Sequence, residues 1–309
     1  MGACSNYYFL KSLTFIQSFF FCNYFYGICA VALAIESNLQ QRIPLNNSIF
    51  YLLLFTGTVW FYTQAYVAAT YTPSNNKRSM WYYQHRRWVQ TSQRLLLSIL
   101  LVGAVGLAYR YGHQLVVLSI WEWLLLLAFP LVGIMYYGFV GQRLNLRNIG
   151  WLKPFWIGFT WAGTVNVYPI IYYHITTGNS TPIDFFSVVL FFKNFMFVTV
   201  LCILFDIKDY ADDYNRKLKT FVVKKGLRFT LFYIVIPLSI AGLGSFLAYS
   251  FTHHFSSGRI AVNTIPFIAI ITVTYSMQQR KPMLFYLFLI DGLMLLKAIC
   301  GSIGILYFS

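Results

Sequence analysis

Long apolar runs, separated by short charged segments, dominate this sequence. A helix needs about 20 mostly apolar residues to cross the hydrocarbon core of a bilayer. Only 10% of the 309 residues are charged, against about 25% in average soluble domains. The pattern excludes a soluble globular protein and predicts an all-α fold, a single transmembrane domain (1–309) built as a bundle of about nine transmembrane helices. The runs cover roughly 13–35, 48–69, 95–111, 115–136, 155–174, 184–205, 228–250, 259–278 and 283–307.

The basic residues indicate how these helices are oriented. If the N-terminus is cytoplasmic, most Lys and Arg residues fall in cytoplasmic loops, and only Arg42, Arg110 and Arg259 fall outside. This asymmetry is the positive-inside pattern of integral membrane proteins. The net charge of +15 is then explained by cationic loops that face anionic lipid headgroups. The bilayer is the expected partner, and no nucleic acid is needed to explain the charge.

The acidic residues are few, and half of the eight lie between the runs 184–205 and 228–250. In a helix, Asp206, Asp209 and Asp213 point within about 60° of one another, whereas Asp212 points away. Carboxylates on one face repel each other unless a cation lies between them, and Mg²⁺ prefers such oxygen ligands and bridges them to phosphates. The three aspartates therefore predict a magnesium site. The alternative is a solvated loop whose acids only balance the basic residues around them.

The same segment resembles a motif of a known family. Asp206-Ile207-Lys208-Asp209, with Asp213 and the stretch Thr220–Gly226, is similar to the second aspartate-rich motif of the UbiA superfamily of intramembrane prenyltransferases. The chain departs from the motif at Lys217, where the family has glycine, and at Phe221 and Val222, where it has Leu and Pro. Lys153 resembles a further family position, and Asp291-Gly292 does so more weakly.

The resemblance implies a nine-helix UbiA-like bundle in a bacterial inner (plasma) membrane. Such a protein transfers an isoprenyl group from an isoprenoid diphosphate to an acceptor, with Mg²⁺ as cofactor. A catalytically inactive relative that binds an isoprenoid or lipid phosphate is the alternative. A transporter is disfavoured because the runs show neither an internal repeat nor matched Gly or Pro interruptions.

The first acidic motif of the family has no counterpart in this chain, since no acidic residue lies between Glu36 and Glu122. The corresponding segment is basic, and its cations have three open roles. In the first, they replace the missing metal ions at a diphosphate, since Arg binds phosphate through paired hydrogen bonds and Lys acts as a point charge. In the second, they pair with the acidic loop in a metal-free structure. In the third, they contact lipid headgroups. The first role predicts diphosphate binding by Lys77, Arg78, Arg86 and Arg87, together with Lys153, and fewer Mg²⁺ ions than usual.

Polar residues inside the predicted spans are further candidates for a functional site. Charged groups are expensive within a membrane and are usually kept there for function. Lys193, Asn194 and Asp291 lie far from the ends of their runs, and a Lys193–Asp291 pair is one option. Glu122 and Lys297 are expected nearer the outer interface, where long side chains reach water.

Overall fold

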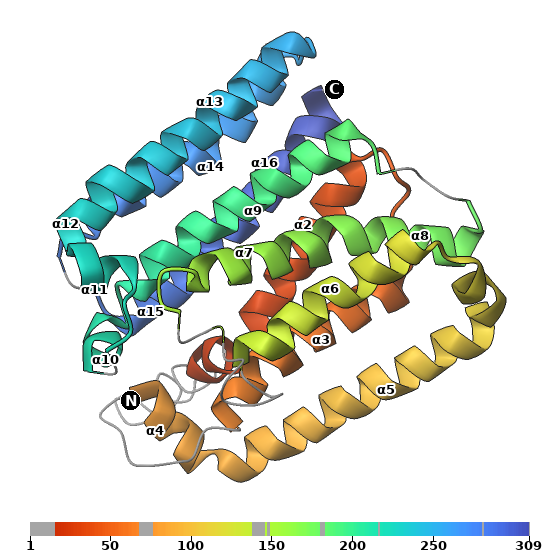
Figure 1. Cartoon of the computed structure of the whole chain (residues 1–309), viewed down its shortest axis with the longest axis horizontal. Helices are drawn as coiled ribbons and strands as arrows, with labels where there is room; N and C mark the ends of the chain where they lie inside the picture. Colours follow the sequence, from red (N-terminus) through yellow and green to blue (C-terminus); the bar gives the residue numbers. More distant parts are fainter. Residues whose placement is uncertain are drawn as a thin grey trace, which may run out of the picture. The chain divides into compact units, whose positions relative to one another are not determined.

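The computed structural model describes residues 16–67, 77–137, 146, 149–179, 183–215, 217–279 and 281–308. Every regular element in these residues is helical, which confirms the predicted all-α fold class (Figure 1). The first half contains α2 (Tyr24–Gln40), α3 (Ser48–Val67), α4 (Lys77–Gln84), α5 (Arg86–Val117), α6 (Ile120–Tyr137), α7 (Lys153–Ala162), the π-helical η3 (Gly163–Val167) and α8 (Tyr168–Thr177). The second contains α9 (Phe185–Asp206), α10 (Tyr210–Asn215), α11 (Phe221–Lys225), α12 (Leu227–Phe229), η4 (Thr230–Val235), α13 (Ile236–Thr252), α14 (Ser257–Ser276), α15 (Met283–Phe285), η5 (Tyr286–Ile290) and α16 (Asp291–Phe308).

Five helical segments are long and apolar enough to cross a membrane. This property supports an integral membrane protein whose environment is a lipid bilayer. It tests neither the predicted number of nine spans nor the predicted orientation. The five segments are Arg86–Val117, Phe185–Asp206, Leu227–Thr252, Ser257–Ser276 and Met283–Phe308.

The chain forms two compact units. Unit 1 contains residues 1–31 and 47–112, and unit 2 contains residues 32–46 and 113–309. Unit 1 therefore holds α3, α4 and most of α5, whereas unit 2 holds α6 to α16. Helix α2 begins in unit 1 and ends in unit 2.

In unit 2, α7 packs along α9 (Figure 1). A glycine allows the two helices to approach closely, because a Cβ atom at Gly158 would lie 2.9 Å from the backbone oxygen of Phe195. The next turns of the chain leave the regular α-helix at η3, and Pro169 lies in the first turn of α8 that follows. Helices α13 and α14 pack together, as do α14 and α16.

Candidate functional site

A lysine and two aspartates from three separate segments meet in unit 2. Lys153 is the first residue of α7, Asp206 is the last residue of α9, and Asp213 lies in α10. The Lys153 Nζ atom lies 2.5 Å from Asp206 Oδ1 and 3.9 Å from Asp213 Oδ2. The exposed fractions of the three side chains are 12%, 5% and 7%. This buried cluster, which we call the Lys153 cluster, brings together three of the residues that the sequence singled out.

The loop after α9 gives the Lys153 cluster its geometry. Asp209 N donates to the Asp206 carbonyl and Asp213 N to the Asp209 carbonyl, so helical turns continue past the end of α9. These turns bring Asp213 back to the side of Asp206, as the predicted spacing requires. Asp209 is more exposed, and its Oδ1 atom lies 3.1 Å from Lys208 Nζ.

The segment that resembles the family motif continues through this loop to Gly226. Lys217 adopts a φ of 56°, in the left-handed region that favours glycine. This is the position where the family motif carries glycine, so the backbone there has a glycine-like conformation although the side chain does not. Thr220 caps α11 by accepting a hydrogen bond from Val223 N. Gly226 has a φ of 84°, which explains a glycine at that position.

A second glycine joins this loop to the start of α7. A Cβ atom at Gly150 would lie 2.7 Å from both Lys219 C and Thr220 N, which leaves no room for a side chain. The segment before α7 therefore lies directly against the segment before α11. This contact positions Lys153 over the end of α9.

The electrostatics of the cluster keep Lys153 protonated. Burial by itself lowers the pKa of Lys153, but Asp206, Tyr136, Asp213 and Asp209 raise that pKa well above its ordinary value. One buried oxygen, Asp206 Oδ2, has no hydrogen-bond partner in the residues that the structure describes. Carboxylate oxygens suit Mg²⁺, so Asp206 retains an oxygen for a second cation while the other oxygen accepts from Lys153.

The magnesium site predicted at Asp206, Asp209 and Asp213 stays a prediction. No group of three or more His, Cys, Asp or Glu side chains in the described ranges is arranged to hold a metal ion. Lys153 is the cation between Asp206 and Asp213, and Asp209 faces Lys208. The assignment of Mg²⁺ to these aspartates is therefore carried into the proposal below.

The predicted diphosphate-binding arginines lie in unit 1 and have different environments. Arg78 is buried, with 3% exposure, and donates to the Phe21 carbonyl at 2.6 Å and to Asn23 Oδ1 at 2.7 Å. Its guanidinium also lies 4.3 Å from the centre of the Tyr66 ring. Arg86 and Arg87, at the start of α5, are exposed. The side chain of Lys77 falls outside the described positions.

The contacts of Arg78 have a structural cause. The first helix is interrupted at residues 22 and 23, where Asn23 has a φ of 62°, and the interruption leaves carbonyl groups without helical partners. Arg78 and Tyr82 donate to the Phe21 carbonyl, and Thr63 donates to the Cys22 carbonyl at 2.9 Å. Arg78 therefore stabilises a helix break inside unit 1, a role different from the three predicted for the basic segment.

The charged residues inside the apolar helices of unit 2 are arranged differently from the expectation. Lys297 does not reach water: it is 4% exposed and its Nζ atom donates to both oxygens of Glu36, at 2.7 and 3.0 Å. Lys193 lies 4.9 Å from the centre of the Phe246 ring and belongs to none of the ion pairs within the described part of the chain. Asp291 is buried, and the Lys193–Asp291 pair is not formed. Glu122 pairs with His174 at 2.5 Å.

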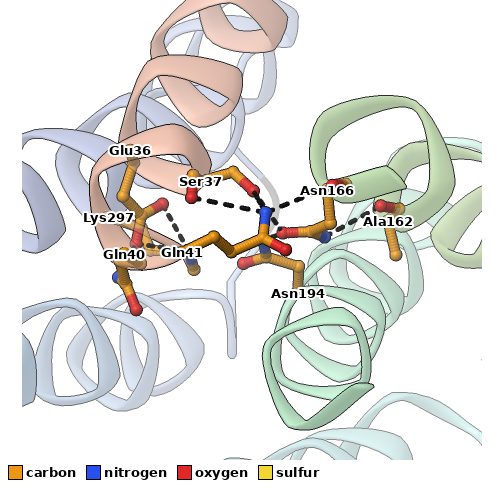
Figure 2. A network of polar contacts seen from close by, with 8 residues as sticks. All are labelled: Glu36, Ser37, Gln40, Gln41, Ala162, Asn166, Asn194 and Lys297. Atoms are coloured by element: carbon orange, nitrogen blue, oxygen red, sulfur yellow. Dashed lines mark hydrogen bonds and ion pairs between the residues drawn. The ribbon is translucent and has the colours of Figure 1, made fainter. Parts of the chain in front are cut away.

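Figure 2 shows that Glu36 begins a larger buried polar network. Ser37 Oγ donates to Asn166 Oδ1 at 3.0 Å, and Asn194 Nδ2 donates to the same oxygen at 2.8 Å. Gln41 Nε2 donates to Ser37 Oγ at 2.7 Å. The network thus joins the end of α2 to η3 and α9. Of its members, only Asn194 was predicted from the sequence as a candidate site residue.

A sequence signal for the other members exists. Glu36 and Gln40, and likewise Ser37 and Gln41, are spaced by four residues and therefore share a face if the first helix continues past residue 35. The apolar run ends near residue 35, but α2 continues to Gln40. The boundary of the apolar run concealed the pattern.

Comparison with known proteins gives no independent assignment: no family model, no curated protein and no solved structure matches this chain.

Proposed function

We propose that this chain is a UbiA-like membrane prenyltransferase. It transfers an isoprenyl group from an isoprenoid diphosphate to an aromatic or other lipophilic acceptor. The observation that carries the proposal is the Lys153 cluster at the end of α9. Its lysine and its two buried aspartates come from the segments that resemble the UbiA superfamily, and one Asp206 oxygen accepts from no donor among the described residues.

The proposed chemistry uses these residues together with Asp209. Mg²⁺ bound by Asp206, Asp209 and Asp213 would neutralise the leaving diphosphate. Lys153 has a raised pKa and supplies a second, permanent positive charge beside the carboxylates. The ester C–O bond breaks, the diphosphate leaves with the electron pair, and the acceptor forms the new bond to carbon and releases a proton. Stabilisation of the leaving group is the main electrostatic contribution of such a site.

Aromatic side chains next to the cluster suit the carbon skeleton of the substrate. Phe155, two residues after Lys153, has its ring centre 6.3 Å from those of Phe195 and Phe221. The faces of such rings attract positive charge, and their bulk excludes water from a carbocation. The exposed Arg86 and Arg87 are proposed to contact the diphosphate in place of the missing acidic motif.

The proposed setting is a bacterial plasma membrane crossed by nine helices, with the N-terminus in the cytoplasm. The positive-inside pattern supports the orientation. In this orientation the end of α9 that carries Asp206 faces the cytoplasm, where a soluble diphosphate leaving group is released.

A second candidate function is a non-catalytic protein that binds an isoprenoid or lipid phosphate. Lys153 favours it, because its ammonium already lies beside both Asp206 and Asp213 without a metal ion. The absence of a first acidic motif from the sequence points the same way.

Release of inorganic diphosphate from geranylgeranyl diphosphate separates the two candidates. Purified protein in nanodiscs is supplied with Mg²⁺ and a mixture of aromatic acceptors, and diphosphate is measured for the wild type and for Asp206→Asn. Release that needs Mg²⁺ and is lost in Asp206→Asn supports the transferase. Binding of the substrate without release supports the non-catalytic function.

The basic segment has its own test. If Arg86 and Arg87 contact the diphosphate, their replacement by Gln weakens binding of geranylgeranyl diphosphate, and the loss is larger at low ionic strength. An unchanged affinity assigns both residues to lipid headgroups.

A further inference from the structure

A cavity of about 220 Å³ lies in unit 2, away from the Lys153 cluster. Its walls come mainly from α9, α13 and α14, three of the helices that are apolar enough to cross a membrane. Lys193 lines it from α9, thirteen residues before Asp206. At a rise of 1.5 Å per residue, this separation is about 20 Å along the helix. The cavity is therefore distinct from the proposed diphosphate site.

The wall of the cavity is almost entirely apolar. Phe186, Phe197, Phe246 and Phe267 contribute aromatic surface, and the polar members include Gln40 and Ser245. Phe192 also lines the cavity and is 54% exposed, so the wall continues onto the outer apolar surface of α9. A lipophilic molecule can therefore enter from the side of the helices.

The ammonium of Lys193 is the exception in this wall. It lies against the Phe246 ring and takes part in no ion pair with any residue that the structure describes. An ionisable group inside a membrane segment is costly unless something compensates its charge. The charged groups that act on Lys193 are Lys297, Glu36 and Arg259.

The polar network engages Glu36, the acid that acts on Lys193, through other partners (Figure 2). Both oxygens of Glu36 accept from Lys297, and Oε1 also accepts from Gln40 at 2.6 Å. The Glu36 charge is thus committed to Lys297. Arg259 lies over the Phe255 ring at 3.7 Å and adds positive charge. A protonated Lys193 therefore has no ion-pair partner among the described residues inside these apolar walls.

We propose that this cavity binds a single-chain carboxylate of the fatty-acid class, with the carboxylate on Lys193 and the chain between α9, α13 and α14. The volume is below the range of about 300–1,000 Å³ for pockets that hold drug-sized ligands, which favours one chain over a two-chain lipid. One ammonium matches a singly charged head, whereas a diphosphate requires several cations or a metal ion. A cationic lipid is repelled, and a neutral chain leaves Lys193 uncompensated.

Photolabelling tests the proposal directly. The full-length protein in phosphatidylcholine nanodiscs is irradiated with a diazirine derivative of dodecanoate, and the labelled peptides are mapped by mass spectrometry. We expect labelling on α9 and α13 that saturates and is displaced by unlabelled dodecanoate. Dodecanol, which lacks the charge, should compete at least about tenfold less well, since a charge-assisted hydrogen bond is lost.

The variants assign this preference to Lys193. Lys193→Met keeps an unbranched side chain and removes the charge, so it should remove the preference for dodecanoate over dodecanol, whereas Lys193→Arg should retain it. Lys225→Met is the matched control, because Lys225 also lies over a phenylalanine ring, at 5.5 Å from the centre of Phe229, but is exposed and remote from the cavity wall. This control should label like the wild type.

A second variant keeps the proposal testable independently of the charge. Ser245 is exposed and lines the cavity, so Ser245→Trp should fill part of the space and reduce labelling while Lys193 is intact. Equal competition by dodecanol and dodecanoate, equal labelling of Lys193→Met and the wild type, or labelling confined to other helices would each overturn the proposal.

Discussion

Replacement of Lys153 by Met should strongly destabilise the protein, because it removes the cation that pairs with the buried carboxylate of Asp206. Lys153 Nζ lies 2.5 Å from Asp206 Oδ1, and the two side chains are 12% and 5% exposed. Removal of one partner from a buried ion pair costs about 3–5 kcal/mol. Protonation of the remaining carboxyl limits the cost. With an ordinary pKa near 3.9, it requires about 4 kcal/mol at pH 7 and about 1.5 kcal/mol at pH 5.

The expected result is a loss of about 3–4 kcal/mol in the free energy of unfolding at pH 7 that shrinks as the pH falls to 5. The sign follows because the folded variant takes up a proton on Asp206 more readily than the unfolded chain does. Steric trapping in bicelles measures this free energy for the wild type, Lys153→Met, Asp206→Asn and the double variant. The double variant should lose at least about 1 kcal/mol less than the sum of the single losses.

Asp209→Asn is the control, because Asp209 also pairs with a lysine of the same loop but is 30% exposed. It should change the free energy of unfolding by no more than about 1 kcal/mol. Additive losses in the Lys153 and Asp206 variants, or a loss for Lys153→Met that does not depend on pH, would refute the reasoning.

The remaining predictions concern backbone conformation and packing. Lys217→Gly should stabilise the fold by up to about 1 kcal/mol, because glycine adopts the left-handed φ of this position without strain. Lys219→Gly is the control and should not stabilise the fold, because Lys219 is outside that conformation. Thermal unfolding in detergent measures both variants. Gly158→Ala should lower the melting temperature because its Cβ atom meets the backbone of α9, whereas Gly292→Ala has no atom within 4 Å of the new Cβ and should be neutral or stabilising. Glu36→Gln should lower the free energy of unfolding by about 3–5 kcal/mol, since it leaves the buried ammonium of Lys297 without its carboxylate. A smaller loss than that of Glu122→Gln would contradict this effect of burial.

The helical fold class was predictable from the sequence because apolar runs of the length of a membrane span leave few alternatives. The ends of the helices were less predictable. The first apolar run ends near residue 35, yet α2 continues to Gln40, because buried polar partners and not apolar side chains hold its last turn. Glu36 therefore lies in the interior, although its position at the end of an apolar run suggested a boundary.

The candidate site was predictable in part. The spacing of Asp206 and Asp213 indicated that they face the same side, and the resemblance selected Lys153; the structure joins all three. The partner of Asp209 is its sequence neighbour Lys208, a contact that depends on the turn after α9 and not on helical spacing. Arg78 was selected for its charge, but its environment is set by a helix break at Asn23 that no periodicity reveals.

The pairing of Lys297 with Glu36 could not be predicted from the sequence for a different reason. The two residues are 261 positions apart, and a single sequence contains no signal that relates the first helix to the last. Only the structure shows that Lys297 pairs with Glu36 while Lys193 lies against the Phe246 ring. The fatty-acid proposal rests on this difference.

Thermal stabilisation by geranylgeranyl diphosphate, with and without Mg²⁺, tests the central claim most directly, because a ligand stabilises the state that it binds. The measurement compares the wild type with Asp209→Asn, whose own stability should be close to that of the wild type. The proposed function predicts an increase in melting temperature that requires Mg²⁺ and vanishes in the variant. No increase in either protein, or an equal increase in both without Mg²⁺, would contradict a metal-assisted diphosphate site at these aspartates.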